Sequence, residues 1–403
     1  MKKALFRTIY NFFRPRLRLH PDVDSLILGG YRLTNPSNAL VPAENITFAS
    51  RVIASGMWNY CFFQFYRHFA GPYWVERQYN PEDPSFIPRA NSMLSLNLTH
   101  RTWLGFRSAR GRYFSLLDPA GAISPVVGYY SLEFAEKTGN RLRLPARGEW
   151  KTEHRLPRGV PVPRVRYRSS HLELRVRMSG AAQDLVLISL RAKAQSDTEC
   201  LIALRPFHPE GATLLHSLSA EERENGLEVS VNGKREIFFP EKPDRIAFSN
   251  LDHGDSYFQT ASKKGIECAY GVATAVFGLS LKAGEERNFV FATRTYERDE
   301  TQKKEKKPLP IHWPSKEQIL SSIQSEKEQW DSAISAGAQF VTARKLFNDA
   351  ARIYQGFLLS LARGPEITPG CFTYRQFFFR DAAYMLSALQ HWNHLEPARA
   401  VLN

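Results

Sequence analysis

The sequence has 403 residues, of which 43% are hydrophobic and 12% aromatic, and its formal net charge is +14. This length allows two or three domains with large apolar cores, which excludes disorder of the whole chain. No stretch approaches the roughly 18 consecutive apolar residues of a membrane-spanning helix. The basic residues are spread along the chain without a nucleic-acid-binding motif, so we interpret them mostly as solvated surface and expect no nucleic-acid partner.

Residues 1–20 form a basic, partly amphipathic N-terminal leader. Its apolar part is interrupted by Arg7 and Asn11, and no small-residue cleavage site follows, so it is a poor signal peptide. We expect a flexible or packed leader. The alternative is a helix lying on a membrane surface, which would attach only weakly because Pro15 ends the segment.

Residues 21–297 read as one strand after another, without helical periodicity between them. The clearest example is 171–178, where polar residues alternate with an apolar set, as in a half-buried strand. Turn sequences such as Asp118-Pro119 and Asn232-Gly233 separate the runs. We therefore predict a large antiparallel β-sandwich domain over 21–297.

Three segments of this region allow a functional interpretation besides a structural one. The aromatic stretch 57–81 has rings in both alternating positions, so we expect it to pack between domains, with glycan binding as the alternative. The loop 205–211 holds an Arg, a His and a Glu, and we favour a rigid proline-containing turn over a site. We interpret the cluster 252–255 as a polar loop tip rather than a site with metal or acid–base groups.

Metal and cofactor ligands are not evident. The four cysteines are separated widely and show no CxxC or Cys/His ligand spacing: Cys61, Cys200, Cys268 and Cys371. We expect free, mostly buried thiols in a reducing, cytoplasmic compartment, and neither a metal nor another cofactor. His391 and His394 are three residues apart, which could be metal geometry, but we recognise no ligand set around them and expect no metal there.

Residues 298–337 are predicted to be a charged linker followed by a linker helix. Ser315 and Gln318 form a capping box at the start of this helix. An apolar stripe then follows at helical spacing: Ile319, Ile323, Trp330 and Ile334. Residues 338–403 read as the start of a helical domain, in which a second helix at 342–361 points a set of apolar residues inward: Phe347, Ala350, Tyr354, Phe357, Leu358 and Leu361.

The stretch 371–389 runs from an aromatic extended segment into a third helix, which Arg380 and Asp381 open. The helix has one apolar face: Ala382, Met385, Leu386 and Leu389. Aromatic rings beside an Arg/Asp pair suit a sugar, because rings face its C–H side and charged groups bind its hydroxyls. The structural alternative is that Asp381 favours the helix start, Arg380 reaches a surface carboxylate and the phenylalanines are core.

The string from Tyr374 through Phe378, Arg380 and Asp381 to Met385 resembles the first helical hairpin of six-hairpin, (α/α)6-toroid glycosidases, the glucoamylase group. The resemblance implies that Arg380 and Asp381 hold the hydroxyls of the terminal sugar, with Tyr374 and Phe378 facing it. Relatives often have Trp where this chain has Phe378, so stacking there would be weaker. The implied fold is a β + α multidomain chain, in which a supersandwich-like β-sandwich precedes a linker helix and the first helices of a truncated (α/α)6 toroid.

The resemblance also implies an activity, namely inverting hydrolysis of α-linked glucose oligosaccharides by the complete form. Members of the group use a general acid Glu and a second carboxylate that normally come from later hairpins. The catalytic residues are therefore unknown in this chain, and Glu396, directly before Pro397, suits a helix start only. The alternative is a non-catalytic carbohydrate-binding or interaction β-sandwich on a helical scaffold, and the oligomeric state is not indicated.

Overall fold

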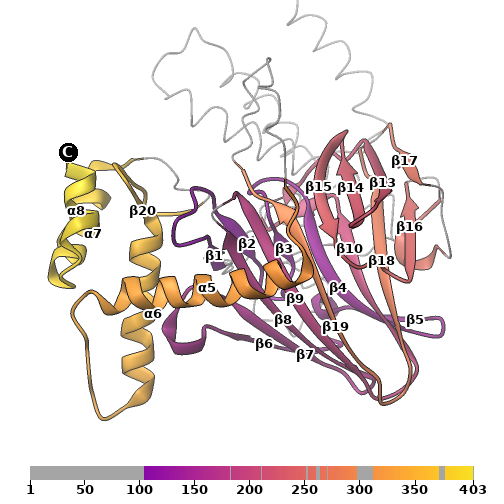
Figure 1. Cartoon of the computed structure of the whole chain (residues 1–403), viewed down its shortest axis with the longest axis horizontal. Coiled ribbons are helices and arrows are strands. Elements are labelled where there is room, and N and C mark those ends of the chain that lie inside the picture. Colours follow the sequence, from indigo (N-terminus) through magenta and orange to yellow (C-terminus); the bar gives the residue numbers. More distant parts are fainter. Residues whose placement is uncertain are drawn as a thin grey trace, which may run out of the picture.

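The computed structural model describes residues 104–181, 183–209, 211–250, 253–259, 264–269, 271–296, 312–371 and 377–402. Over these residues the chain forms two antiparallel sheets that pack face to face, and four helices follow at one end (Figure 1). This confirms the predicted antiparallel β-sandwich with C-terminal helices. The leader, the aromatic stretch 57–81 and most of the charged linker lie outside the described residues, and the predicted domain boundaries stay predictions.

Sheet A has eight strands. Seven are hydrogen-bonded to their neighbours in the order β1-β2-β3-β4-β10-β18-β16, and β5 pairs with β4 outside this order. Its strands are β1 (Leu104–Phe106), β2 (Ser115–Leu117), β3 (Ile123–Ser124), β4 (Ser131–Thr138), β5 (Arg141–Arg143), β10 (Thr198–Arg205), β16 (Arg245–Ser249) and β18 (Thr274–Leu281).

Sheet B is the nine-stranded sheet, with the order β17-β13-β14-β15-β19-β9-β8-β7-β6. Its strands are β6 (Lys151–Arg155), β7 (Arg164–Arg168), β8 (Leu172–Ala181), β9 (Leu185–Ala194), β13 (Ser217–Arg223), β14 (Gly226–Val231), β15 (Lys234–Phe239), β17 (Gly265–Glu267) and β19 (Glu286–Arg294). The shorter elements are β11 (Phe207–His208) with β12 (Gly211–Ala212), β20 (Ala362–Arg363) with β21 (Glu366–Ile367), and the 3-10 turns η2 (Pro145–Arg147), η3 (Pro157–Gly159) and η4 (Ser256–Phe258).

The main core lies between the two sheets. The alternation in β8 is confirmed, because its apolar side chains are all fully buried there: Leu172, Leu174, Val176 and Met178. Burial of such a side chain contributes about 1.5–3 kcal/mol. The residues between them in the strand, Glu173, Arg175 and Arg177, therefore face outward from sheet B.

The helix α5 (Lys316–Ser335) joins the sandwich to the other helices. Its capping box is present, since Ser315 accepts from the Gln318 backbone N–H and Gln318 accepts from the Ser315 backbone N–H. All four residues of the predicted stripe are buried. Ile319 and Ile323 pack on the outer face of sheet B, while Trp330 and Ile334 belong to the core of the helical region. One helix face is thus shared by two cores.

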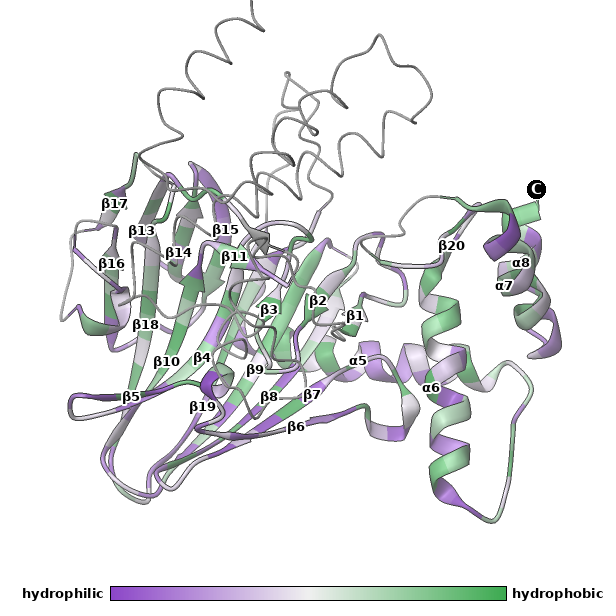
Figure 2. Cartoon of the chain, turned by 180° about the vertical axis from the view of Figure 1, so that it is seen from behind, coloured by the Kyte–Doolittle hydropathy of each residue, from purple (hydrophilic) through white to green (hydrophobic). Residues whose placement is uncertain are grey.

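The remaining helices are α6 (Lys345–Leu361), α7 (Phe379–His391) and α8 (Leu395–Leu402). The inward face expected for α6 is partly wrong, because Phe347 and Tyr354 are 51% and 71% exposed. The helix instead meets η3 at Gly159, where an added Cβ would lie 2.6 Å from the Cβ of Arg352. The close approach of the two backbones selects that face of α6, and Leu346, Phe347 and Tyr354 are left exposed. Figure 2 shows the hydrophobic residues along α6. None of the described helices is long and apolar enough to span a membrane.

The predicted Asn232-Gly233 turn joins β14 to β15, and both residues have positive φ, 50° and 76°. The Asn232 side-chain oxygen accepts from the backbone N–H groups of His216 and Ser217 at 2.7 and 3.2 Å. Its amide group donates to the Tyr129 hydroxyl and the Leu214 carbonyl, both at 3.0 Å. The residue therefore ties three segments of the sandwich together.

We predict that Asn232→Ala lowers the free energy of unfolding by about 2–4 kcal/mol, because four hydrogen bonds are lost as well as the tolerance of positive φ. The measurement is chemical denaturation. Asn393→Ala is the matched control, since Asn393 also has positive φ, 59°, and its side chain makes no hydrogen bond within the described residues. Equal losses in the two variants would show that the hydrogen bonds contribute nothing.

Glu236 is completely buried, and its carboxylate accepts from the Tyr296 hydroxyl at 2.7 Å. Burial raises the pKa of Glu236 from 4.5 to about 7, partly offset by the hydrogen bond from Tyr296. The folded protein then binds this proton more tightly than the unfolded chain does. Stability is therefore lost as the pH rises between these two values, and it levels off above about pH 7.

We predict that Glu236→Gln flattens this section of the stability–pH profile and makes the protein more stable than wild type at pH 8 by on the order of 1 kcal/mol or more. Urea denaturation from pH 4.5 to 8 measures the profile. Glu224→Gln, in an exposed turn, is the control. An unchanged slope in Glu236→Gln would contradict the assignment.

Candidate carbohydrate-binding site

The position of the candidate site depends on Arg107, which follows β1 and is 6% exposed. Its guanidinium donates to three carbonyls at the C-terminal end of α6: Ser360 at 2.7 Å, Leu359 at 3.2 Å and Ala362 at 3.2 Å. The last carbonyls of a helix have no partner within the helix and carry partial negative charge, so a cation is favoured there. Arg107 thereby fixes the point at which the chain leaves α6.

Burial lowers the pKa of Arg107 to about 10, and the nearby Arg363 acts in the same direction. Glu326 opposes this shift, so the guanidinium remains charged at neutral pH. Glu326 itself is buried on α5 and accepts from the Ser108 hydroxyl at 2.6 Å and the Ala109 backbone N–H at 2.9 Å. A buried carboxylate held by two donors locks α5 to the segment after β1.

Sequence reasoning missed both residues. A signal existed for Glu326, which lies on the apolar stripe of α5, three residues after Ile323 and four before Trp330. A charged residue at such a position has to find a buried partner. No pattern in the sequence distinguishes Arg107, because its acceptors are backbone carbonyls more than 250 residues away.

After α6 the chain turns through β20 and β21 and then crosses β1 at Cys371. Gly105 makes this crossing possible, because a Cβ there would lie 2.4 Å from the Cys371 Sγ. Cys200, Cys268 and Cys371 are free thiols, as predicted. The sandwich therefore sets both ends of the segment between α6 and the aromatic stretch before α7.

Arg380 and Asp381 lie in the first turn of α7, after Phe378 at the N-cap. The Arg380 Nη2 is 3.7 Å from the Asp381 Oδ2, and the two side chains are 83% and 36% exposed. An exposed pair of this kind contributes little to stability. Phe378 is 39% exposed, and Tyr374 lies outside the described residues.

Further exposed aromatic residues lie within a few positions of this pair in the chain. Phe377, Phe379 and Tyr384 are 58%, 82% and 72% exposed. Tyr384 is four residues after Arg380, so the two share a face of α7. The apolar side of α7 is the predicted one, with Ala382 and Leu389 buried. The arrangement presents donors, acceptors and ring faces to solvent together, which can bind a sugar but holds no acid–base pair.

Arg205, at the end of β10, and Asp255, at the N-cap of η4, meet on the outer face of sheet A, where Tyr257 of η4 packs with Leu201 and Ala203. The Arg205 guanidinium is completely buried and forms a bidentate pair with Asp255 at 2.7 and 2.8 Å. The interpretation of 252–255 as a polar loop tip is thus wrong for Asp255, which is 3% exposed and closes η4 onto β10. Buried charges require such pairing, so the cluster is structural.

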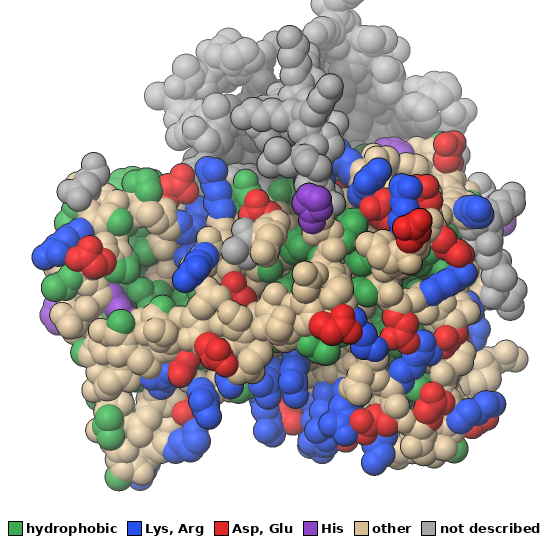
Figure 3. Space-filling view, in the orientation of Figure 1, with side chains coloured by type: hydrophobic (Ala, Val, Ile, Leu, Met, Phe, Trp, Pro, Cys, Tyr) green, Lys and Arg blue, Asp and Glu red, His purple; other side chains and the backbone are tan. Residues whose placement is uncertain are grey.

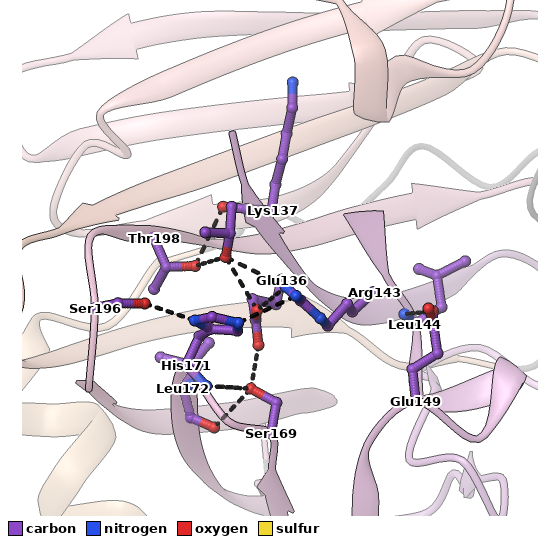
Figure 4. A network of polar contacts seen from close by, with 11 residues as sticks. Glu136, Lys137, Arg143, Leu144, Glu149, Ser169, His171, Leu172, Ser196 and Thr198 are labelled. Carbon is purple, nitrogen blue, oxygen red and sulfur yellow. Dashed lines mark hydrogen bonds and ion pairs between the residues drawn. The ribbon is translucent and has the colours of Figure 1, made fainter. Parts of the chain in front are cut away.

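A second polar network joins β4, β5 and the start of β8 (Figure 4). His171 Nδ1 lies 2.7 Å from the Ser196 hydroxyl, as in a nucleophile–base pair. However, Arg143 lies 3.1 Å from His171 Nε2 and can only donate, so Nε2 accepts and Nδ1 carries the proton. His171 therefore cannot activate Ser196. Glu136 completes the network by accepting from Arg143 at 2.6 Å.

The histidines near the C-terminus bond to neighbouring groups. His391 Nδ1 contacts the Ser387 carbonyl at 2.7 Å, and His394 Nε2 contacts the Gln355 side-chain oxygen at 3.1 Å. Within the described residues no cluster of three or more His, Cys, Asp or Glu side chains could hold a metal ion.

No protein-family profile matches the sequence, and no curated protein matches it significantly. The structure is similar to a bacterial glucoamylase solved in complex with acarbose, with 10% identity and a TM-score of 0.50, over 74% of this chain and 48% of the glucoamylase. A family GH92 glycosyl hydrolase (9% identity, TM-score 0.36) aligns over 65% of this chain and 39% of its own. A GH92 α-mannosidase from Bacteroides thetaiotaomicron has 9% identity and a TM-score of 0.26, over 62% of this chain and 34% of the mannosidase.

The chain therefore spans about half the length of the glucoamylase. At this identity the likeness shows a shared fold. It confirms the expected combination of a β-sandwich with the first helices of a six-hairpin glycosidase fold.

We predict that Arg107→Met removes the cap on α6 and destabilises the helical region by about 2–4 kcal/mol, because the α6 carbonyls and Glu326 lose their buried cation. Hydrogen–deuterium exchange should show loss of protection in α6–α8 and little change in β8 and β9. Arg110→Met, at an exposed position three residues away, is the control. Equal exchange in Arg107→Met and wild type would contradict the assigned role.

Proposed function

We propose that this chain belongs to a carbohydrate-active protein of the glycoside hydrolase type, whose complete form acts on α-linked glucose oligosaccharides by inverting hydrolysis. The supporting observation is the exposed Arg380–Asp381 pair beside Tyr384 and Phe378 at the start of α7. The fold shared with a glucoamylase that was solved with acarbose supports the same proposal.

In this proposal Arg380 and Asp381 bind the terminal sugar and take no part in bond cleavage. The guanidinium donates to sugar hydroxyls, the Asp381 carboxylate accepts from them, and the aromatic rings contact the C–H face. Inverting hydrolysis needs two carboxylates roughly 6.5–9.5 Å apart, one to protonate the leaving oxygen and one to activate water. We assign neither role to a described residue, and Glu396 is occupied by an exposed ion pair with Arg399 at 2.7 Å.

We predict that this chain binds acarbose and maltooligosaccharides weakly, and that Asp381→Asn and Arg380→Gln each weaken binding about 10–100-fold, the usual effect of losing a charged hydrogen bond. Isothermal titration calorimetry measures the affinities.

The Glu396→Gln and Arg399→Gln variants provide the matched control, because they remove another exposed Arg–carboxylate pair, this one from α8. They should bind as wild type does. Wild-type affinity in Asp381→Asn and Arg380→Gln would refute the site, and retained sugar binding would then point to the sandwich as a non-catalytic carbohydrate-binding module.

A further inference from the structure

The outer face of sheet B carries an unusual concentration of positive charge. The outward positions of β6–β9 hold nine cations, which we call the arginine face: Lys151, Arg155, Arg164, Arg166, Arg168, Arg175, Arg177, Arg191 and Lys193. Figure 3 shows Lys and Arg side chains gathered below α5, where these strands lie in Figure 1. Residues dispersed in the sequence thus form one continuous surface.

The strand register places like charges directly opposite one another. Arg164 pairs with Arg177, and Arg175 pairs with both Arg166 and Arg191 on its two sides. Like charges in directly opposed positions destabilise a sheet. The sandwich fold alone gives no reason for this arrangement, which therefore indicates an anionic partner.

Carboxylates neutralise only some of this charge. Within the described strands three lie on the same side, Glu153, Glu173 and Glu286, against the nine cations. Glu173 is shared by Arg166 and Arg175, each at 2.6 Å, and these hydrogen bonds and charges lower its pKa. An excess of positive charge remains.

Four members of the arginine face form no ion pair with a described carboxylate: Lys151, Arg164, Arg177 and Lys193. Partial burial, together with the neighbouring charge of Arg177, lowers the pKa of Arg164. The cross-strand repulsion is thus felt in the folded protein.

The helix α5 sets the boundary of this face. Further along the same strands the outward residues become apolar, and Ala181, Leu185 and Leu187 are buried beneath Ile319 and Ile323 of α5. The charged positions beyond the helix are intermediate or exposed in the described structure. Among the described residues, α5 therefore covers one end of this sheet surface, and no other element covers the charged end.

The geometry of the arginine face fits a planar array of phosphates. Neighbouring strands are about 4.8 Å apart and alternate residues about 7 Å apart, so the cations form a two-dimensional grid. Seven of the nine are Arg, which binds phosphate in a bidentate manner.

No large apolar side chain is exposed on the described residues of β6–β9, so the face offers no ring for base stacking and no group for insertion into lipid. A linear polyanion suits a groove or a projecting element, whereas these cations lie in a grid across four neighbouring strands. We propose that the arginine face docks electrostatically on an anionic phospholipid membrane surface, with phosphate headgroups as its ligands. This inference shares no residue with the carbohydrate site and does not depend on it.

The test is sedimentation of the full chain with phosphatidylcholine vesicles that contain a minority of phosphatidylglycerol, compared with pure phosphatidylcholine vesicles. At about 0.1 M salt we expect the protein to bind the anionic vesicles and not the pure phosphatidylcholine vesicles. This binding should be lost at about 1 M salt, where the Debye screening length is about 3 Å. The triple variant Lys151→Gln, Arg164→Gln, Arg177→Gln breaks none of the described ion pairs. We expect this triple variant to partition about 100-fold less onto the anionic vesicles, because each lost cation weakens binding about fivefold. Its melting temperature should not fall.

The control triple variant is Arg141→Gln, Lys264→Gln, Arg344→Gln, which removes the same charge at exposed positions outside the arginine face. It should bind nearly as wild type does. Three results would overturn the proposal: unchanged vesicle binding in the first triple variant, equal loss in the control, or a stronger dependence of heparin or duplex DNA binding on the arginine face. Unchanged binding would place membrane contact elsewhere, and the last result would identify a linear polyanion as the partner.

Discussion

The structure depends on a buried guanidinium at the end of a helix. Arg107 belongs to the sandwich by sequence, but its donors satisfy carbonyls of α6, and its own carbonyl accepts from Trp330 of α5 at 3.3 Å. One residue therefore joins the sheet, the linker helix and the helix that follows it. Because hydrogen bonds are directional, this contact fixes the exit of α6 in a way that apolar packing alone would not.

Such contacts hold the chain from the end of α6 to Cys371. Arg107 fixes the end of α6, and Gly105 admits Cys371 against β1. The aromatic segment then leads to Arg380 and Asp381, which the sandwich does not touch in the described structure. The proposed sugar site is consequently a surface feature presented by a rigid support, and its exposed rings and charges gain little by folding alone.

Prediction from sequence succeeded where a local pattern determines the structure. The alternation in β8, the turn at Asn232 and the capping box at Ser315 each depend on residues within a few positions of one another. Prediction failed where contact with a backbone segment distant in the sequence determines which residues are buried. The face of α6 was wrong at Tyr354 because η3 approaches the helix at a glycine, which hydrophobicity does not reveal.

The same distinction applies to charge and to the site. Arg205 and Asp255 were read as separate loops because a buried pair across 50 residues leaves no local pattern. The arginines of β7 and β8 read as dispersed surface charge, since only the strand register places them opposite one another. For the site, the sequence pattern predicted Arg380 and Asp381 together at a helix start, as observed. Arg107 and Glu326, which hold α6 and α5 to the segment after β1, were not recognised.

We propose that a sugar binds at the start of α7, beside Arg380 and Asp381. Hydrogen–deuterium exchange of the full chain, with and without saturating acarbose, tests it most directly. We expect that protection increases at residues 377–384, with little change in the sheets. Protection confined to the sandwich strands, or no change at the start of α7 at saturation, would contradict it.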